Sequence, residues 1–87
     1  MKVYIVWGET GEYEDRDVWI AKIFKNKAQA ELFMIECQKY ANYMMEEVEG
    51  EVGIYPRYYI EEHNSPDKKF SIDYTGTSYF LSEEEVE

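Results

Sequence analysis

The sequence is poor in the residues that most catalytic and metal sites require. It contains one cysteine, Cys37, and one histidine, His63. A single cysteine excludes a disulfide within the chain and any metal site built from several cysteines, and it suits a reducing cytoplasm. A cysteine nucleophile needs a neighbouring base, which in turn is oriented by a third group. The sequence near Cys37 and His63 supplies no such set, so we expect a buried Cys37, an exposed His63 and no enzyme activity.

Motifs for metals, phosphates and cofactors are also missing. The acidic run EYEDRD lacks the central glycine and the distal glutamate of a calcium loop. The glycines in GETG and YTGTS do not have the spacing of a phosphate-binding or dinucleotide-binding loop. We therefore expect no metal and no cofactor.

Positive charge is scarce. Nine lysines and arginines stand against 19 acidic residues, which gives a formal net charge of −10. Such a chain is repelled by nucleic acids and by anionic membranes, whereas a basic protein surface complements it. Solubility alone is the alternative explanation for this charge. Long apolar runs are absent as well, so we expect no segment that spans a membrane.

Two apolar segments near the start of the chain predict strands. Residues 2–8 and 17–24 are rich in β-branched and aromatic side chains. Strand alternation suggests that Val3 and Ile5 face the core and that Tyr4 faces outward or lies along an edge. On the second strand, with Lys22 in water, the same alternation directs Trp19, Ala21 and Ile23 to the core.

A helix is predicted to follow. Asn26 is a favourable N-cap residue, and no glycine or proline interrupts the chain until Gly50. Positions 30, 33, 37, 41, 44 and 48 form a helical stripe that can cover a sheet. Apolar residues also lie outside this stripe, and Leu32, Ile35 and Met45 are a candidate dimer face.

The remainder of the chain predicts one short strand near 58–61, a turn at NSPD and extended structure on both sides of Thr75-Gly76. The expected fold class is α+β, with a small antiparallel sheet of three or four strands and one long helix packed on one face. Residues 1–87 are expected to form a single domain, with a frayed acidic tail at 82–87.

Acidic residues and tyrosines recur together in this chain. The segment GETGEYEDRD, residues 8–17, holds five carboxylates, and tyrosines cluster again after Gly53. Tyrosine suits protein interfaces, and carboxylates pair with arginine and lysine. The predicted partner-binding residues are Glu9, Glu12, Tyr13, Glu14, Asp15, Asp17, Tyr55, Tyr58 and Tyr59.

The opening KVYIVWGETGEYEDRDVWIAKIFKNKAQAELF and the late DYTGTSYFLSEEEVE resemble a group of small, uncharacterised phage and prophage proteins. The resemblance covers more than half of the chain and omits residues 38–68. It implies a β-β-α-β fold and a viral or prophage origin, but no activity.

Three functions remain open at this stage. The first is binding to a host protein with a basic surface, where the acidic chain would mimic nucleic acid and inhibit a defence or nucleic-acid-handling complex. The second is an oligomer that binds a signalling nucleotide, with Trp7, Trp19 or the tyrosines stacked on the base. Against it, phosphates need positive charge, and only Lys68, Lys69, Arg57 and a few other basic residues are available. The third is a structural homodimer.

Overall fold

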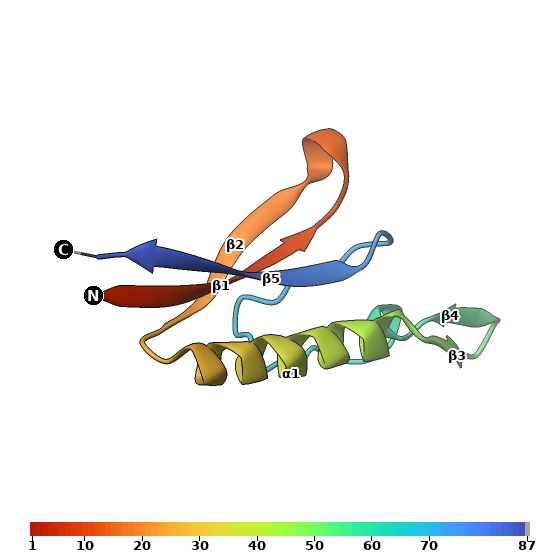
Figure 1. The fold of residues 1–87 in the computed structure, drawn as a ribbon. Coiled ribbons are helices and arrows are strands. Elements are labelled where there is room, and N and C mark those ends of the chain that lie inside the picture. Colours follow the sequence, from red (N-terminus) through yellow and green to blue (C-terminus); the bar gives the residue numbers. More distant parts are fainter. Residues whose placement is uncertain (87) are drawn as a thin grey trace.

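The computed structural model describes residues 1–86 and confirms the α+β class (Figure 1). One helix packs on a three-stranded antiparallel sheet, and a separate two-stranded hairpin follows the helix. In chain order the elements are β1 (Lys2–Thr10), the 3-10 turn η1 (Tyr13–Asp15), β2 (Asp17–Phe24), α1 (Lys27–Met45), β3 (Glu47–Glu49), β4 (Ile54–Pro56), η2 (Arg57–Tyr59) and β5 (Thr77–Glu85).

The order of strands in the sheet is β2-β1-β5, and α1 lies along one face only (Figure 1). The β3–β4 hairpin extends beyond the C-terminal end of α1, away from the sheet. The Cα extents of 55 × 28 × 14 Å describe a long, thin molecule. Its thinnest dimension accommodates one sheet and one helix, which leaves the second face of the sheet without a covering layer in residues 1–86.

The residues of β1 that face α1 are the opposite of those that alternation suggested. Val6, Gly8 and Thr10 are buried beneath the helix, whereas Val3 and Ile5 lie on the other face. The prediction for Val3, Ile5 and Tyr4 was therefore wrong. The prediction failed because β1 carries apolar side chains at both odd and even positions. Alternation with a period of two residues therefore does not indicate which face of the strand the helix covers.

A β-bulge explains the error on β2. The register pairs Val6 with Lys22 but Trp7 with Ile20, which leaves Ala21 as an extra residue. Trp19 and Ala21 pack against the core as predicted. Beyond the bulge the alternation changes phase, so Phe24 joins the core and Ile23 is 52% exposed.

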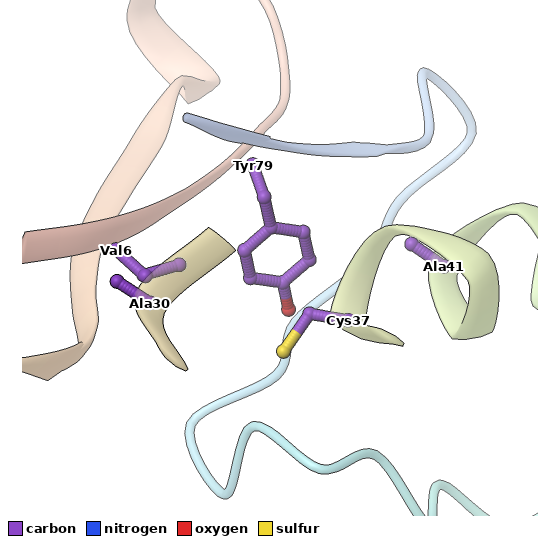
Figure 2. Close-up of a cluster of buried hydrophobic side chains, with 5 residues drawn as sticks. All are labelled: Val6, Ala30, Cys37, Ala41 and Tyr79. Carbon is purple, nitrogen blue, oxygen red and sulfur yellow. The ribbon is translucent and has the colours of Figure 1, made fainter. Parts of the chain in front are cut away.

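The core contains small residues on the helix and large ones on the sheet. Ala30, Cys37 and Ala41 of α1 meet Val6 and Tyr79, and all five are buried (Figure 2). Met44, the next turn of the same stripe, is also buried. The predicted stripe is thus confirmed at 30, 37, 41 and 44, and its small side chains let α1 approach the sheet closely enough to enclose Tyr79.

The predicted start of the helix is confirmed, and its predicted end is wrong. Asn26 caps the helix, since its Oδ1 accepts a hydrogen bond from the Gln29 N–H at 3.0 Å. The helix ends at Met45 rather than near Gly50, because Glu46 is extended and residues 47–49 pair with β4. The strand predicted near 58–61 is replaced by β4 and η2, and residues 60–76 then return to the sheet without regular structure.

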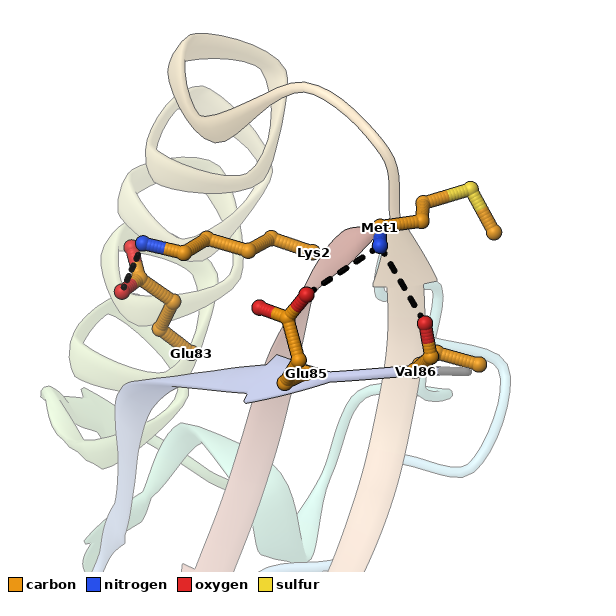
Figure 3. A network of polar contacts seen from close by, with 5 residues as sticks. All are labelled: Met1, Lys2, Glu83, Glu85 and Val86. Carbon is orange, nitrogen blue, oxygen red and sulfur yellow. Dashed lines mark hydrogen bonds and ion pairs between the residues drawn. The ribbon is translucent and has the colours of Figure 1, made fainter.

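The two ends of the chain lie side by side (Figure 3). The amino group of Met1 lies 3.2 Å from Glu85 Oε1, and Lys2 Nζ lies 3.3 Å from Glu83 Oε2. Residues 82–85, predicted to be part of a frayed tail, instead form the end of β5 and pair with β1. Residue 87 lies outside the described residues. In residues 1–86 no helix has the length and apolar character needed to cross a membrane.

Candidate functional site

The predicted acidic loop is exposed and folded into the single turn η1. Glu12, Glu14, Asp15 and Asp17 are all exposed, and Tyr13 is 93% exposed with a positive φ of 52°. The loop is held at its base, where the Gly11 N–H donates a 2.9 Å hydrogen bond to Thr75 Oγ1. Its carboxylates are therefore displayed to solvent on a fixed base.

Glu9 differs from the other carboxylates of this segment. Its Oε2 accepts a 2.8 Å hydrogen bond from Arg16 Nη2, and this bond lowers the pKa of Glu9. Glu9 and Arg16 thus neutralise each other, and the net negative charge of the loop comes from the remaining four acidic residues.

The face of the sheet opposite α1 is apolar along its centre, with Glu9, Ser78, Ser82 and Glu84 as its polar members. Three rows of side chains cross it, each formed by residues that the strand register places opposite one another. The central row is Ile20–Trp7–Phe80, and the Trp7 and Phe80 rings stack with centroids 6.0 Å apart. Phe80 and Val18 are each 40% exposed. We call this surface the open face; its apolar members are Val3, Ile5, Trp7, Val18, Ile20, Ile23 and Phe80.

The open face has the size and surroundings of a binding surface. Nine residues at ~3.3 Å each and three strands ~4.8 Å apart give an area of roughly 400 Å². This is the area of the whole face with its polar residues included, and it is comparable to the largest apolar patches of monomers, which are often functional. The acidic loop adjoins one end of the face. At the other end Glu84, opposite Val3, lies on this face, whereas Glu83 and Glu85 are in phase with the helix side and pair with Lys2 and the Met1 amino group. The partner-binding residues predicted from the sequence did not include Trp7, Val18, Ile20 or Phe80.

Three of the four tyrosines predicted to bind a partner lie elsewhere. Tyr55 and Tyr59 stack with centroids 6.1 Å apart, and Tyr58 meets Tyr59 edge-on at 4.9 Å. Tyr55 and Tyr59 line an open groove of about 760 Å³ together with Glu49 and Glu51. This groove lies at the β3–β4 hairpin beyond the end of α1. The nine predicted residues therefore form two separate clusters, one on the acidic loop and one at this hairpin.

A buried polar cluster lies between α1 and the sheet. Asp67 is 1% exposed, and its Oδ2 accepts hydrogen bonds from Trp19 Nε1 at 2.8 Å and from Tyr79 Oη at 2.7 Å. Its Oδ1 accepts one from the Lys69 N–H at 2.9 Å. Trp19 is consequently part of the interior and is not free to stack on a ligand.

Cys37 adjoins this cluster but is poorly suited to act as a nucleophile. It is fully buried, and burial, followed by the nearby charge of Asp67, raises its pKa to about 12. A thiol with this pKa is protonated at neutral pH. His63 is exposed and packs edge-on against Phe70, with ring centroids 5.3 Å apart. Residues 1–86 contain no group of three or more histidine, cysteine or acidic side chains placed to hold a metal ion.

The candidate dimer face is divided by the structure. Leu32 and Ile35 are exposed on α1. Met45 is half-buried and lies against the loop before β5, where a Cβ on Gly76 would be 3.6 Å from Met45 Cγ. The three residues do not form one surface.

Comparisons with protein-family models, with curated proteins and with solved structures found no match. The resemblance to phage proteins stays a prediction, and the function is argued below from geometry alone.

Proposed function

We propose that this chain is a non-enzymatic binding protein that docks on another protein through the open face and the adjoining acidic loop. The observation that carries the proposal is the apolar row Ile20–Trp7–Phe80, left uncovered in a protein that buries the opposite face of the same sheet. Burying this row against a partner removes apolar surface from water, which is the main driving force of association.

The charge around the open face indicates the chemistry of the partner. Exposed carboxylates lie at both ends of the face, four from the acidic loop and one, Glu84, from β5. A partner with an apolar strip between lysines and arginines complements this arrangement. A second copy of the chain is less suitable, because it would bring another net charge of −10 to the same interface.

The area of the open face supports a role for the loop as well. A stable interface buries about 800 Å² on each partner, roughly twice the area of the face alone. The contact must therefore extend beyond the sheet, and the loop with Tyr13 at its tip is the nearest projecting element on β1 and β2. Four carboxylates would then lie against the basic residues of the partner.

The finer form of the proposal is nucleic-acid mimicry. A basic protein surface that accepts four clustered carboxylates is typical of a surface that binds phosphates. The chain would occupy that surface in a host protein and keep nucleic acid away from it. The phage resemblance and the net charge are what support a host target.

The test is capture of a partner with matched variants. Wild-type protein, the open-face variant Trp7→Thr/Phe80→Thr and a loop variant with Glu12→Gln, Glu14→Gln, Asp15→Asn and Asp17→Asn would be immobilised and exposed to cell extract. Ile35→Thr, exposed on the far side of the molecule, serves as the control. We expect one partner that both site variants retain at least tenfold more weakly than the control does.

Binding measurements with the purified partner then distinguish simple protein binding from nucleic-acid mimicry. Raising the salt concentration from 0.05 to 0.3 M should weaken binding of the wild type strongly and of the loop variant only slightly. Duplex DNA or RNA should compete with the wild type. A partner bound equally by all variants would remove the proposal, whereas a partner that nucleic acid does not displace would remove mimicry alone.

A further inference from the structure

The lysines of this acidic protein are not evenly distributed. Lys22, Lys68 and Lys69 line a groove of about 310 Å³ between β2 and the chain segment around residue 67, together with Ala21, Phe33 and Pro66. Among residues 1–86, no acidic side chain lines it. Like Lys25 and Lys27, these three lysines form no ion pair with a carboxylate of residues 1–86, whereas Lys2, Arg16, Lys39 and Arg57 do.

The walls of this lysine groove are fixed by the interior. Asp67 joins the wall that carries Lys68 and Lys69 to β2, because Asp67 Oδ2 accepts the hydrogen bond from Trp19 Nε1 at 2.8 Å. The Lys69 N–H is bound to Asp67 Oδ1, which shapes the turn on which both lysines lie. Lys22 Nζ lies 5.3 Å and 5.5 Å from the centroids of the Phe24 and Phe33 rings. The three ammonium groups thus project from elements that are already ordered.

The lysine groove adjoins an apolar one. Phe33 and Pro66 also line a second groove of about 380 Å³, whose other apolar members are Phe24 and Leu32. Its acidic residue, Glu36, pairs with Lys39 at 3.9 Å. Positive charge at one end and apolar side chains at the other together match a ligand with an anionic group on an apolar body.

The overall charge does not prevent such a ligand from binding. At physiological ionic strength, fields decay over about 8 Å, so that an anion in the groove responds mainly to the nearest lysines. A water-sized group occupies about 30 Å³, so the lysine groove has room for roughly ten such groups. A small organic headgroup has this size. Both grooves lie within the size range of small-molecule sites.

We propose that the paired grooves between β2, α1 and residues 66–69 bind a small amphipathic anion, a carboxylate or phosphate carried on an aromatic or alkyl body. The anionic group would contact Lys22, Lys68 and Lys69, and the body would lie against Phe33, Leu32 and Pro66. This site lies on the helix side of β2, and the proposal is independent of partner binding on the open face.

The test is a titration of isotope-labelled protein followed by amide NMR shifts, with three probes. The first is 4-phenylbutyrate, the second is its uncharged counterpart 4-phenylbutan-1-ol, and the third is inorganic phosphate. We expect phenylbutyrate to bind most tightly and to shift the amides of Ala21, Lys22, Phe33, Lys68 and Lys69, with a Kd that rises with salt.

Matched variants identify the groups responsible. The triple variant Lys22→Gln/Lys68→Gln/Lys69→Gln should raise the Kd for phenylbutyrate at least tenfold. The control Lys2→Gln/Lys25→Gln/Lys39→Gln changes the net charge equally and should leave the Kd within twofold. Because the substituted lysines are exposed, both variants should retain the dispersed spectrum of a folded protein.

Four outcomes would overturn the proposal. These are absence of phenylbutyrate binding, equal binding of the alcohol and the acid, equal loss of affinity in both triple variants, and shifts centred on Trp7 and Phe80 of the open face. None of these outcomes bears on capture of a protein partner, so that the two proposals fail or stand separately.

Discussion

Trp19 Nε1 donates a hydrogen bond to Asp67 Oδ2 at 2.8 Å and so joins β2 to a residue 48 positions later in the chain. Tyr79 of β5 donates to the same oxygen at 2.7 Å. One buried carboxylate therefore links two strands that are not neighbours in the sheet with the irregular segment 60–76. A long segment without regular structure requires such a contact to hold a defined position.

Asp67→Ala should be among the most destabilising substitutions in the chain. It leaves the indole N–H of Trp19 and the hydroxyl of Tyr79 without their acceptor in the interior. Unpaired buried donors cost about 1–3 kcal/mol each, so we expect the free energy of unfolding to fall by about 3 kcal/mol. Urea unfolding measures this, with exposed Asp15→Ala as a control that should change stability by less than about 0.5 kcal/mol. Equal effects of the two substitutions would contradict the role of Asp67.

Gly8→Ala should also be costly, for a different reason. The register places Gly8 between Trp19 and Tyr79, whose rings meet edge-on above it with centroids 6.4 Å apart. A Cβ at Gly8 would overlap Trp19 Cε2, so that the indole must move. Overpacking of this kind costs about 1–3 kcal/mol.

A double-mutant cycle identifies the indole as the cause of that cost. In a Trp19→Leu background the ring is absent, and we expect Gly8→Ala to cost at least 1 kcal/mol less than in the wild type, as is typical of residues in contact. The measurement is urea unfolding of the four proteins in the cycle. Additive costs would mean that Gly8 is required for another reason.

The fold class could be predicted from the sequence because its signals are local. Asn26 caps α1 directly, and the stripe of Ala30, Cys37 and Ala41 follows from helical periodicity alone. The facing of the strands could not be predicted in the same way. β1 is apolar on both faces, and the bulge at Ala21 changes the phase of β2 without any glycine or proline to mark it.

The candidate sites differ in the same respect. The acidic loop was recognisable because its five carboxylates lie within nine consecutive positions of the sequence. In the structure, four of them form no ion pair with another of the described residues. The lysine groove unites Lys22 with Lys68 and Lys69 only through the bond between Trp19 and Asp67. The open face could not be predicted from the sequence, because its prediction depends on which side of the sheet the helix covers.

The thiol of Cys37 should be unreactive in the folded protein. Its pKa of about 12 compares with about 8.5 for a free cysteine, so its thiolate is scarcer at pH 7.5 by roughly three orders of magnitude. We expect labelling by a thiol-specific aromatic disulfide to be at least 100-fold slower than labelling of the urea-unfolded chain. Rapid labelling in native buffer would show that the thiol is accessible and ionised.

The same shift in pKa predicts loss of stability at alkaline pH. The unfolded thiol ionises near pH 8.5, whereas the native thiol stays protonated, so that the unfolded chain binds fewer protons above this pH. Stability should therefore fall as pH rises from 8.5 to 10, with a slope from Cys37 of up to about 1.4 kcal/mol per pH unit. Burial also raises the pKa of Tyr79, which adds to the loss above pH 10.

The variant Cys37→Ala isolates the contribution of the thiol to that slope. It is expected to be less stable than the wild type throughout, but its free energy of unfolding should fall less steeply between pH 8.5 and 10. Urea unfolding at half-unit intervals of pH measures both slopes. Parallel curves for the two proteins would contradict a thiol that is kept protonated by the fold.

Tyr79 and Phe80 are adjacent on β5 and point to opposite faces of the sheet, so they should separate stability from binding. Tyr79→Phe removes the hydroxyl that donates a hydrogen bond to Asp67, and it should lower the free energy of unfolding by about 1.5 kcal/mol. Phe80→Thr removes a ring that is 40% exposed and should cost less than about 1 kcal/mol, because threonine is favourable in strands. For binding of a captured partner we expect the reverse order, since only Phe80 belongs to the open face. If Tyr79→Phe weakened partner binding as much as Phe80→Thr did, the open face could not be the contact surface.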